Sequence, residues 1–113
     1  MSAKYNLVCE QGTTFNFQFQ ILDDNSPRNL TSYTATMTVR PFIGASTTTV
    51  VASTANGRIT INPTQGRIVV NIDSDITTGF EASRHVYDLI IDSGVTITRI
   101  LEGKFVVTPA VTA

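Results

Sequence analysis

Hydrophobic and polar residues alternate along most of this chain. Over residues 15–21, Phe and Ile occupy every second position, with Asn and Gln between them. Residues 33–40 repeat the alternation with Thr and Arg as the polar residues, and Pro41 follows directly. A period of two predicts a β-strand with one face on a core, and Pro ends a strand because it has no amide proton to donate. The sequence therefore predicts strands over 15–21 and 33–40, joined by a chain reversal at the turn-forming residues 23–28.

A hairpin is predicted over residues 58–72. The Pro-Thr-Gln-Gly segment at 63–66 has the composition of a tight turn and joins two apolar runs. Centring the hairpin on this turn places two cross-strand pairs on one apolar face: Ile59 with Val70, and Ile61 with Ile68. Residues 73–80 then offer capping side chains and a Gly exit, which predicts a single helical turn crossing between sheets. No longer helix is expected anywhere in the chain.

The last predicted hairpin runs over 85–92 and 95–108, with Ser93-Gly94 as a two-residue turn. Such a turn fixes four cross-strand pairs on one face: Asp92 with Val95, Ile90 with Ile97, Asp88 with Arg99, and Val86 with Leu101. The opposite face then carries Tyr87, Leu89, Ile91 and Ile100. Gly103 interrupts the long last strand, and a lone Gly inside a strand predicts a bulge or a bend where the strand changes partner.

Residues 42–55 have no clear period. We predict a loop over 43–46, while 48–53 fit either a short strand or part of that loop. The whole chain then contains about seven or eight short strands separated by turn signals, which is the pattern of a sandwich or barrel. We predict an all-β fold, an immunoglobulin-like antiparallel β-sandwich, as one domain over residues 1–113.

Composition adds limits on the partners of this domain. Only 15% of the 113 residues are charged, and the formal net charge is −1 without any run of Lys or Arg. We therefore expect neither nucleic acid nor a membrane surface as a partner. The first residues lack the apolar stretch of a signal peptide and no segment is long enough to span a membrane, so we expect a soluble protein made in a cytoplasm. We interpret the single Cys9 as a buried, inert thiol.

Residues that support catalysis are scarce. The chain has one His and one Cys, whereas catalysis needs a nucleophile with a base, paired carboxylates or a metal cluster. We interpret His85 as an exposed or edge imidazole at the start of a strand, not as a catalytic base. The acidic segments 23–25 and 73–75 lack the Gly and bidentate Glu of a calcium loop, so we expect turn and capping roles. We predict no enzyme activity, no small-molecule substrate, no cofactor and no metal.

The final hairpin carries a candidate interface, because both of its faces are substantially apolar. With Tyr87 and Leu89 on the core, the other face places the pair of Asp88 and Arg99 among apolar side chains. In the alternative interpretation, loops of the same domain cover this face. The candidate partner-interface residues, including two from the irregular segment, are Val86, Asp88, Ile90, Val95, Ile97, Arg99, Leu101, Phe42 and Ile43.

Several segments carry a pattern beyond strand periodicity. They are Glu-Gln-Gly-Thr-Thr-Phe at 10–15, Leu-Thr-Ser-Tyr-Thr-Ala-Thr-Met-Thr-Val-Arg at 30–40, Tyr-Asp-Leu at 87–89, and Thr-Arg-Ile-Leu-Glu-Gly-Lys-Phe at 98–105, which leads to Val-Thr-Pro at 107–109. In these segments the chain resembles small β-sandwich virion proteins of tailed bacteriophages, cyanophage-like and associated with the tail or baseplate. It departs from them at Asn29, where Asp is more usual, and residues 42–57 match nothing in the pattern.

The resemblance implies an immunoglobulin-like fold, several copies per particle and contacts with other virion proteins. It carries over no catalytic residue. It implies instead that Tyr33 and Tyr87 anchor the core, that Gly12 and Gly103 permit backbone bends, and that Pro109 ends the last strand.

We therefore expect a structural protein of the virion that mediates protein–protein assembly as a tail or baseplate adaptor. One alternative is a capsid decoration (cement) protein. Another is a receptor- or glycan-binding module at a fibre tip, for which the loop aromatics Phe42 and Phe80 are the available residues. Homo-oligomer formation is compatible with each of these roles.

Overall fold

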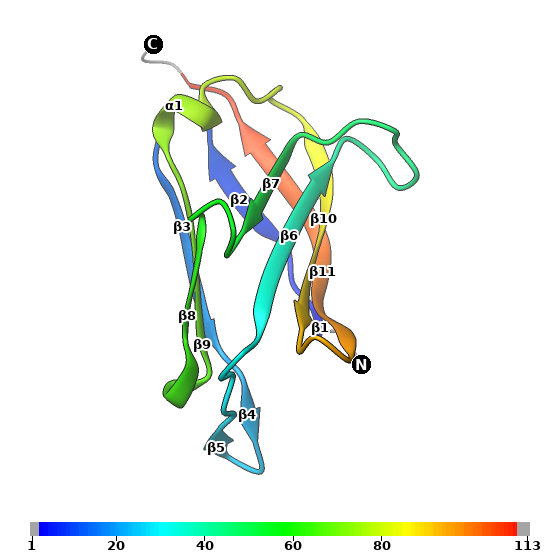
Figure 1. Ribbon diagram of the computed structural model, residues 1–113. Helices are drawn as coiled ribbons and strands as arrows, with labels where there is room; N and C mark the ends of the chain where they lie inside the picture. Colours follow the sequence, from blue (N-terminus) through cyan, green and yellow to red (C-terminus); the bar gives the residue numbers. More distant parts are fainter. Residues whose placement is uncertain (1–2, 111–113) are drawn as a thin grey trace.

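Two β-sheets pack face to face in this computed structural model, which describes residues 3–110 (Figure 1). Sheet A contains β1 (Ala3–Lys4), β2 (Leu7–Glu10), β6 (Thr34–Arg40), β7 (Val50–Ser53), β10 (Arg84–Asp92) and β11 (Ile97–Thr108). Sheet B contains β3 (Phe15–Gln20), β8 (Ile59–Asn62) and β9 (Arg67–Ile72). The remaining elements are the hairpin of β4 (Leu22–Asp23) and β5 (Ser26–Pro27), the 3-10 turn η1 (Pro63–Gln65) and the helix α1 (Ser74–Thr77).

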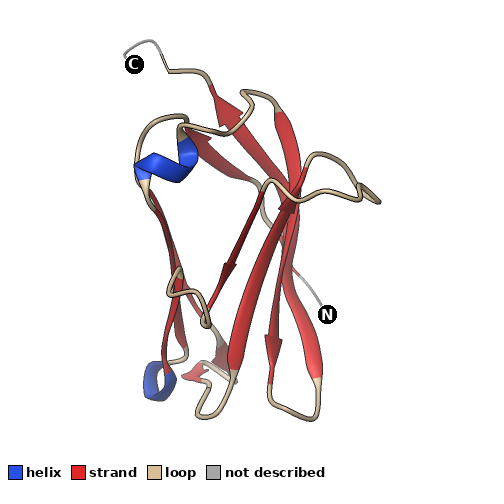
Figure 2. Cartoon of the chain, turned by 45° about the horizontal axis from the view of Figure 1, so that its top comes forward, coloured by secondary structure: helices blue, strands red, loops and turns tan. Residues whose placement is uncertain are grey.

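The strand order identifies the fold. Sheet A runs β2-β11-β10-β6-β7, with β1 beside β11 on the same edge as β2, and sheet B runs β3-β9-β8. Figure 2 shows the strands in two layers. The strands of both sheets pair antiparallel except that β1 and β2 run parallel to β11. The chain changes sheet between β2 and β3, β3 and β6, β7 and β8, and β9 and β10, as in immunoglobulin-like sandwiches. The predicted immunoglobulin-like β-sandwich is confirmed.

Aromatic rings join the two sheets at the centre. Phe105 of β11 packs edge-on against Phe15 of β3, with 5.2 Å between ring centroids, and against Phe80 at 6.2 Å. Phe80 is buried, so it is not available as a loop aromatic for a glycan. Cys9 of β2 is buried on the same side of sheet A, as predicted. Each large apolar side chain buried in this way stabilises the fold by about 1.5–3 kcal/mol, so the shared core holds the sheets together.

The predicted β8–β9 hairpin is confirmed, including its register. The two predicted apolar pairs are both present: Ile59 with Val70, and Ile61 with Ile68. η1 makes the turn, and Gly66 ends it with a φ of 61°. The backbones of Ile21 and Arg28 lie so close to Gly66 that any side chain there would collide with them. The single helical turn predicted within 73–80 is α1.

The predicted register of the β10–β11 hairpin is wrong. Asp92 pairs with Ile97, so the connecting loop spans 93–96 and not 93–94. Polar side chains stabilise this loop: the Asp92 carboxylate accepts the N–H of Gly94 at 2.7 Å, and the Ser93 hydroxyl accepts the N–H of Thr96 at 3.0 Å. The register shifts again between Leu89 and Ile90. The outward-facing pairs are therefore Ile90 with Arg99, Asp88 with Glu102, and Val86 with Lys104.

Gly103 lies where β11 changes its neighbour on one side. β1 pairs with Leu101 and Glu102, whereas β2 pairs with the residues from Phe105 onward. The bulge itself lies nearer the hairpin tip, at the register shift. The Tyr5 backbone crosses so close to Gly103 that a Cβ atom there would collide with the Tyr5 carbonyl group. The predicted change of partner at Gly103 is confirmed, and its cause is this close approach.

His85 is buried, so its predicted exposure is wrong. Its Nε2 donates a hydrogen bond to the Glu81 carbonyl oxygen at 2.9 Å, and its Nδ1 forms a hydrogen bond of 2.9 Å with the Thr49 hydroxyl. Thr49 precedes β7, the strand that resolves the ambiguous segment 48–53. The imidazole therefore fastens the β6–β7 loop to the start of β10, a contact between segments that are far apart in sequence.

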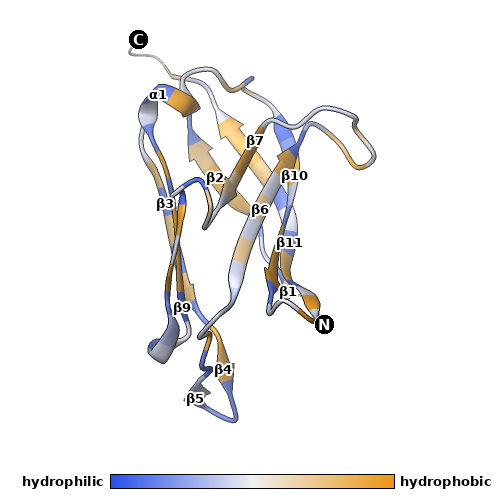
Figure 3. Ribbon diagram, in the orientation of Figure 1, coloured by the Kyte–Doolittle hydropathy of each residue, from blue (hydrophilic) through white to orange (hydrophobic). Residues whose placement is uncertain are grey.

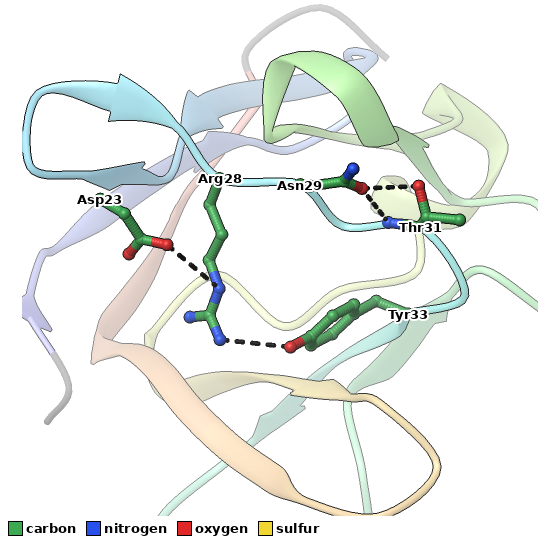
Figure 4. A network of polar contacts seen from close by, with 5 residues as sticks. All are labelled: Asp23, Arg28, Asn29, Thr31 and Tyr33. Carbon is green, nitrogen blue, oxygen red and sulfur yellow. Dashed lines mark hydrogen bonds and ion pairs between the residues drawn. The ribbon is translucent and has the colours of Figure 1, made fainter.

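The chain reverses at 23–28, as predicted. Asp24 and Asn25 have φ angles of 49° and 68°, which form the tight turn of the β4–β5 hairpin. Figure 4 shows Arg28 between its two partners, with Nε 3.8 Å from the Asp23 carboxylate and a hydrogen bond of 3.2 Å to the Tyr33 hydroxyl. The ring of Tyr33 packs against the core. This network orients the chain as it passes from sheet B to sheet A.

Candidate partner interface

The side chains that point outward from β6, β10 and β11 form one continuous surface, which we call the outer face of sheet A. Strand register aligns them in three rows across the sheet: Arg40-Val86-Lys104, Thr38-Asp88-Glu102 and Thr36-Ile90-Arg99. Lys4 of β1 lies beside Glu102. Apolar, charged and hydroxyl side chains are thus mixed on this face. Cross-strand neighbours of this kind lie near enough to act together on a partner.

An ion cluster lies at the middle of the outer face of sheet A. The Arg99 Nε is 3.2 Å from the Asp88 carboxylate, and its Nη1 is 3.8 Å from the Glu102 carboxylate. The predicted contact between Asp88 and Arg99 is therefore confirmed, although Arg99 lies opposite Ile90 and reaches Asp88 diagonally. All three side chains remain partly exposed to solvent. Such pairs contribute at most about 1 kcal/mol to stability, so the cluster is free to serve recognition.

An open hollow of about 580 Å³ lies over the same face. It brings together four of the predicted interface residues, which are Ile43, Val86, Asp88 and Arg99. Ile43 belongs to the loop between β6 and β7, and the other three belong to β10 and β11. Residues far apart in sequence therefore meet around one concave surface.

Exposed apolar side chains mark both ends of this face. Val95 and Ile97, at the tip of the β10–β11 hairpin, are 95% and 64% exposed. Phe42 and Ile43, in the β6–β7 loop, are 62% and 87% exposed. Figure 3 shows hydrophobic colour at the hairpin tip and on this loop, which project at opposite ends of the sheet. The ion cluster and Ile90 lie between them.

Leu101 does not belong to this face, although the sequence predicts it there. It pairs with Leu89 and packs against the core. The cause is the register shift between Leu89 and Ile90, because one extra residue in a strand turns the following side chains to the opposite face.

The N-terminal strands add residues that the sequence prediction left out. Val8 of β2 is 61% exposed and Lys4 lines the hollow, whereas Tyr5, 54% exposed, stacks its ring on Phe17 of sheet B and lies outside this face. The alternation of Leu7 and Cys9 indicates a strand with one buried face, but it does not indicate that this strand pairs with β11. Only the pairing of the first strands with the last one brings Lys4 and Val8 to the edge of sheet A.

The buried Cys9 thiol and Tyr87 phenol stay protonated near neutral pH. Burial raises the pKa of the Cys9 thiol to about 11 and that of the Tyr87 phenol to about 12. The Tyr87 hydroxyl donates to the Tyr5 carbonyl oxygen, so it has the hydroxyl partner that its predicted core role requires. Within residues 3–110, no three His, Cys, Asp or Glu side chains gather in position to hold a metal ion.

Comparison with known proteins assigns no family: no protein-family model matches the chain, and no curated protein matches it. Over the described part of the chain, no helix is long and apolar enough to cross a membrane.

Proposed function

We propose that this protein is a structural assembly subunit, without enzyme activity, that docks onto another protein through the outer face of sheet A. One observation carries the proposal. Exposed apolar side chains at both ends of this face, Ile43 and Ile97 among them, flank the ion cluster of Asp88, Arg99 and Glu102. In protein interfaces, apolar groups supply affinity by leaving water, and charged groups set orientation and partner choice.

The exposed apolar groups contribute little to the fold of the isolated chain. Val95 is 95% exposed and Ile43 is 87% exposed, so neither gains much from folding. Covering such a side chain stabilises a complex by about 1.5–3 kcal/mol. The low charged share of 15% also suits a subunit held permanently among neighbours, since free monomers usually keep more charge for solubility.

The setting we propose is the virion of a tailed bacteriophage, where the subunit acts as a tail or baseplate adaptor. The resemblance of its segments to small virion proteins supports this setting. Three of those segments, 30–40, 87–89 and 98–105, fall largely on β6, β10 and β11, which also build the outer face of sheet A. The segments that resemble virion proteins and the proposed docking surface therefore coincide.

Mass spectrometry of purified particles tests this proposal. Particles of the phage that encodes this chain are separated into heads and tails, and the copies of the chain in each fraction are counted. Recovery with tails supports the adaptor role. Recovery with heads favours a decoration protein instead, and absence from both fractions contradicts a virion role altogether.

A further inference from the structure

The longest open strand edge among the described residues belongs to β3. This strand spans Phe15–Gln20 and pairs with β9 alone. The other edge strands are shorter: β1 has 2 residues, and β2, β7 and β8 have 4 each. In immunoglobulin sandwiches a first strand commonly covers the edge that β3 leaves open. Here the first strands pair with β11 in the other sheet.

The register shows which backbone groups face the open edge. Ile21 donates its N–H to the carbonyl oxygen of Gly66 at 2.8 Å, in line with the β3–β9 register. Hydrogen-bonded pairs alternate along an antiparallel ladder, so the odd-numbered residues of β3 bond to β9. The N–H and C=O groups of Asn16, Gln18 and Gln20 therefore point away from the sheet.

The edge of β7 is closed by contrast. The carbonyl oxygen of Val51 accepts hydrogen bonds from Asn56 Nδ2 at 2.9 Å and from Arg58 Nη1 at 3.0 Å. The N–H of Ser53 donates to Asn56 Oδ1 at 3.0 Å. These are the groups that β7 would offer to another strand, because its alternate residues bond to β6.

β3 has none of the features that protect natural sheet edges. Its sequence, Phe-Asn-Phe-Gln-Phe-Gln, contains no charge, no Pro and no Gly. Phe17 and Phe19 point to the core side but are only partly buried, and Tyr5 stacks on Phe17 with 5.6 Å between ring centroids. Both backbone groups and apolar rings are therefore available along this edge.

We propose that two copies of this chain pair antiparallel through β3, around a two-fold axis at Gln18. The axis lies at Gln18 because only this register pairs all three outward-pointing residues of β3, Asn16, Gln18 and Gln20, with outward-pointing residues of the other β3. Gln18 then lies opposite Gln18 of the partner subunit, and Asn16 lies opposite Gln20 of the partner subunit. Phe17 faces Phe19 of the partner subunit on the core side.

The sequence of β3 favours a second copy over an unrelated strand. Self-pairing sets each amide opposite an amide and each phenyl ring opposite a phenyl ring, and it brings no charges of equal sign together within the paired strands. The pairing joins sheet B of each copy, so it leaves the outer face of sheet A free. This dimer interface is therefore separate from the proposed docking surface.

Sedimentation equilibrium with charge variants at Gln18 tests the dimer. Because edge pairing forms a small interface, we expect a wild-type dissociation constant of about 10–100 µM. Gln18→Lys and Gln18→Glu each place like charges on the axis, so each alone should weaken the dimer by about tenfold or more. An equimolar mixture of the two variants should restore it. Arg67 Nη1 lies 3.4 Å from Gln18 Oε1, so the Glu variant keeps an attractive neighbour and should be the less impaired of the two.

Thr60→Lys and Thr60→Glu are the matched controls. Thr60 is exposed on the same face of sheet B, but on β8. Neither control should change the dissociation constant, and circular dichroism should show all four variants folded. A wild-type chain that stays monomeric at about 1 mM overturns the proposal, given the expected affinity. A wild-type dimer that the Gln18 variants leave intact, or that their mixture fails to restore, also overturns it.

Discussion

The outer faces of the two sheets differ in chemistry although they enclose one core. The outer face of sheet A carries an ion cluster of Asp88, Arg99 and Glu102 between exposed apolar ends. The outer face of sheet B carries mainly neutral amides and hydroxyls, such as Gln18 and Thr60. β10 and β6 of sheet A are hydrogen-bonded on both sides, so the outer face of sheet A exposes side chains alone. Sheet B also exposes the backbone of β3 at its edge, so the two surfaces that we propose as interfaces differ in the groups they offer.

Truncating a side chain of the core that both sheets share should lower the stability most. Phe105→Ala deletes the ring that contacts Phe15 from sheet B and Phe80, so we expect a loss of about 3–5 kcal/mol in the free energy of unfolding. Urea denaturation measures this loss. Phe42→Ala is the control, because its ring is 62% exposed, and it should change stability by about 0.5 kcal/mol or less. Similar effects of the two variants would contradict this account of the core.

Disturbing the contact between the N-terminal segment and β11 should lower the stability less. Gly103→Ala introduces a Cβ atom that collides with the Tyr5 backbone, so we expect a loss of about 1–3 kcal/mol as the N-terminal strand moves away from β11. Gly79→Ala is the matched variant, because its backbone is outside the left-handed region and the added Cβ would meet only the Ile76 carbonyl oxygen, at an ordinary contact distance of 3.6 Å. Thermal unfolding should rank Gly103→Ala as the less stable protein, and the reverse order would show that the Tyr5 backbone does not approach Gly103 as described.

Alkaline pH should lower the stability of the fold by deprotonating Cys9, which is buried beneath sheet A. Burial raises its pKa from 9.0 to about 11, which means that folding favours the protonated thiol. The resulting stability is fully present below pH 9 and is lost as the pH rises to 11. Between these values the wild-type protein should lose about 1–3 kcal/mol more than Cys9→Ala. The titration of Tyr87 is common to both proteins, so parallel pH curves would contradict the burial of Cys9.

The smallest effect on stability is expected from the ion cluster itself. Arg99→Ala removes an exposed cross-strand pair, so the free energy of unfolding should fall by about 1 kcal/mol or less. Chemical denaturation at low and high salt measures this change, which should shrink further as salt screens the pair. A loss several times larger would make the cluster part of the fold and not of a docking surface.

The two hairpins show how far sequence reasoning reaches. The β8–β9 register follows from its turn and apolar alternation, and both predicted pairs are present. The β10–β11 register does not, because the side chains of Asp92 and Ser93 stabilise a longer loop than the Ser-Gly signal indicates. The bulge beyond it then turns Leu101 into the core. Local patterns thus predict strands well, while small insertions decide which face a side chain takes.

Non-local pairings account for the remaining differences. The burial of His85 depends on Thr49 of a distant loop, and the place of Tyr5 and Val8 depends on β11. The sequence did predict Ile43, Val86, Asp88 and Arg99 as interface residues, but only the fold brings them around one hollow. Similarly, the alternation in β3 predicts a strand, whereas its open edge follows from strand order.

The most direct test of the central claim is the incorporation of Ile97→Asp into particles, counted by mass spectrometry against Thr60→Asp. Ile97 is 64% exposed, so its variant should fold normally, yet docking would bury an unpaired charge. We expect Ile97→Asp to be lost from particles and Thr60→Asp, on the outer face of sheet B, to enter at wild-type copy number. Normal incorporation of Ile97→Asp would contradict docking through the outer face of sheet A.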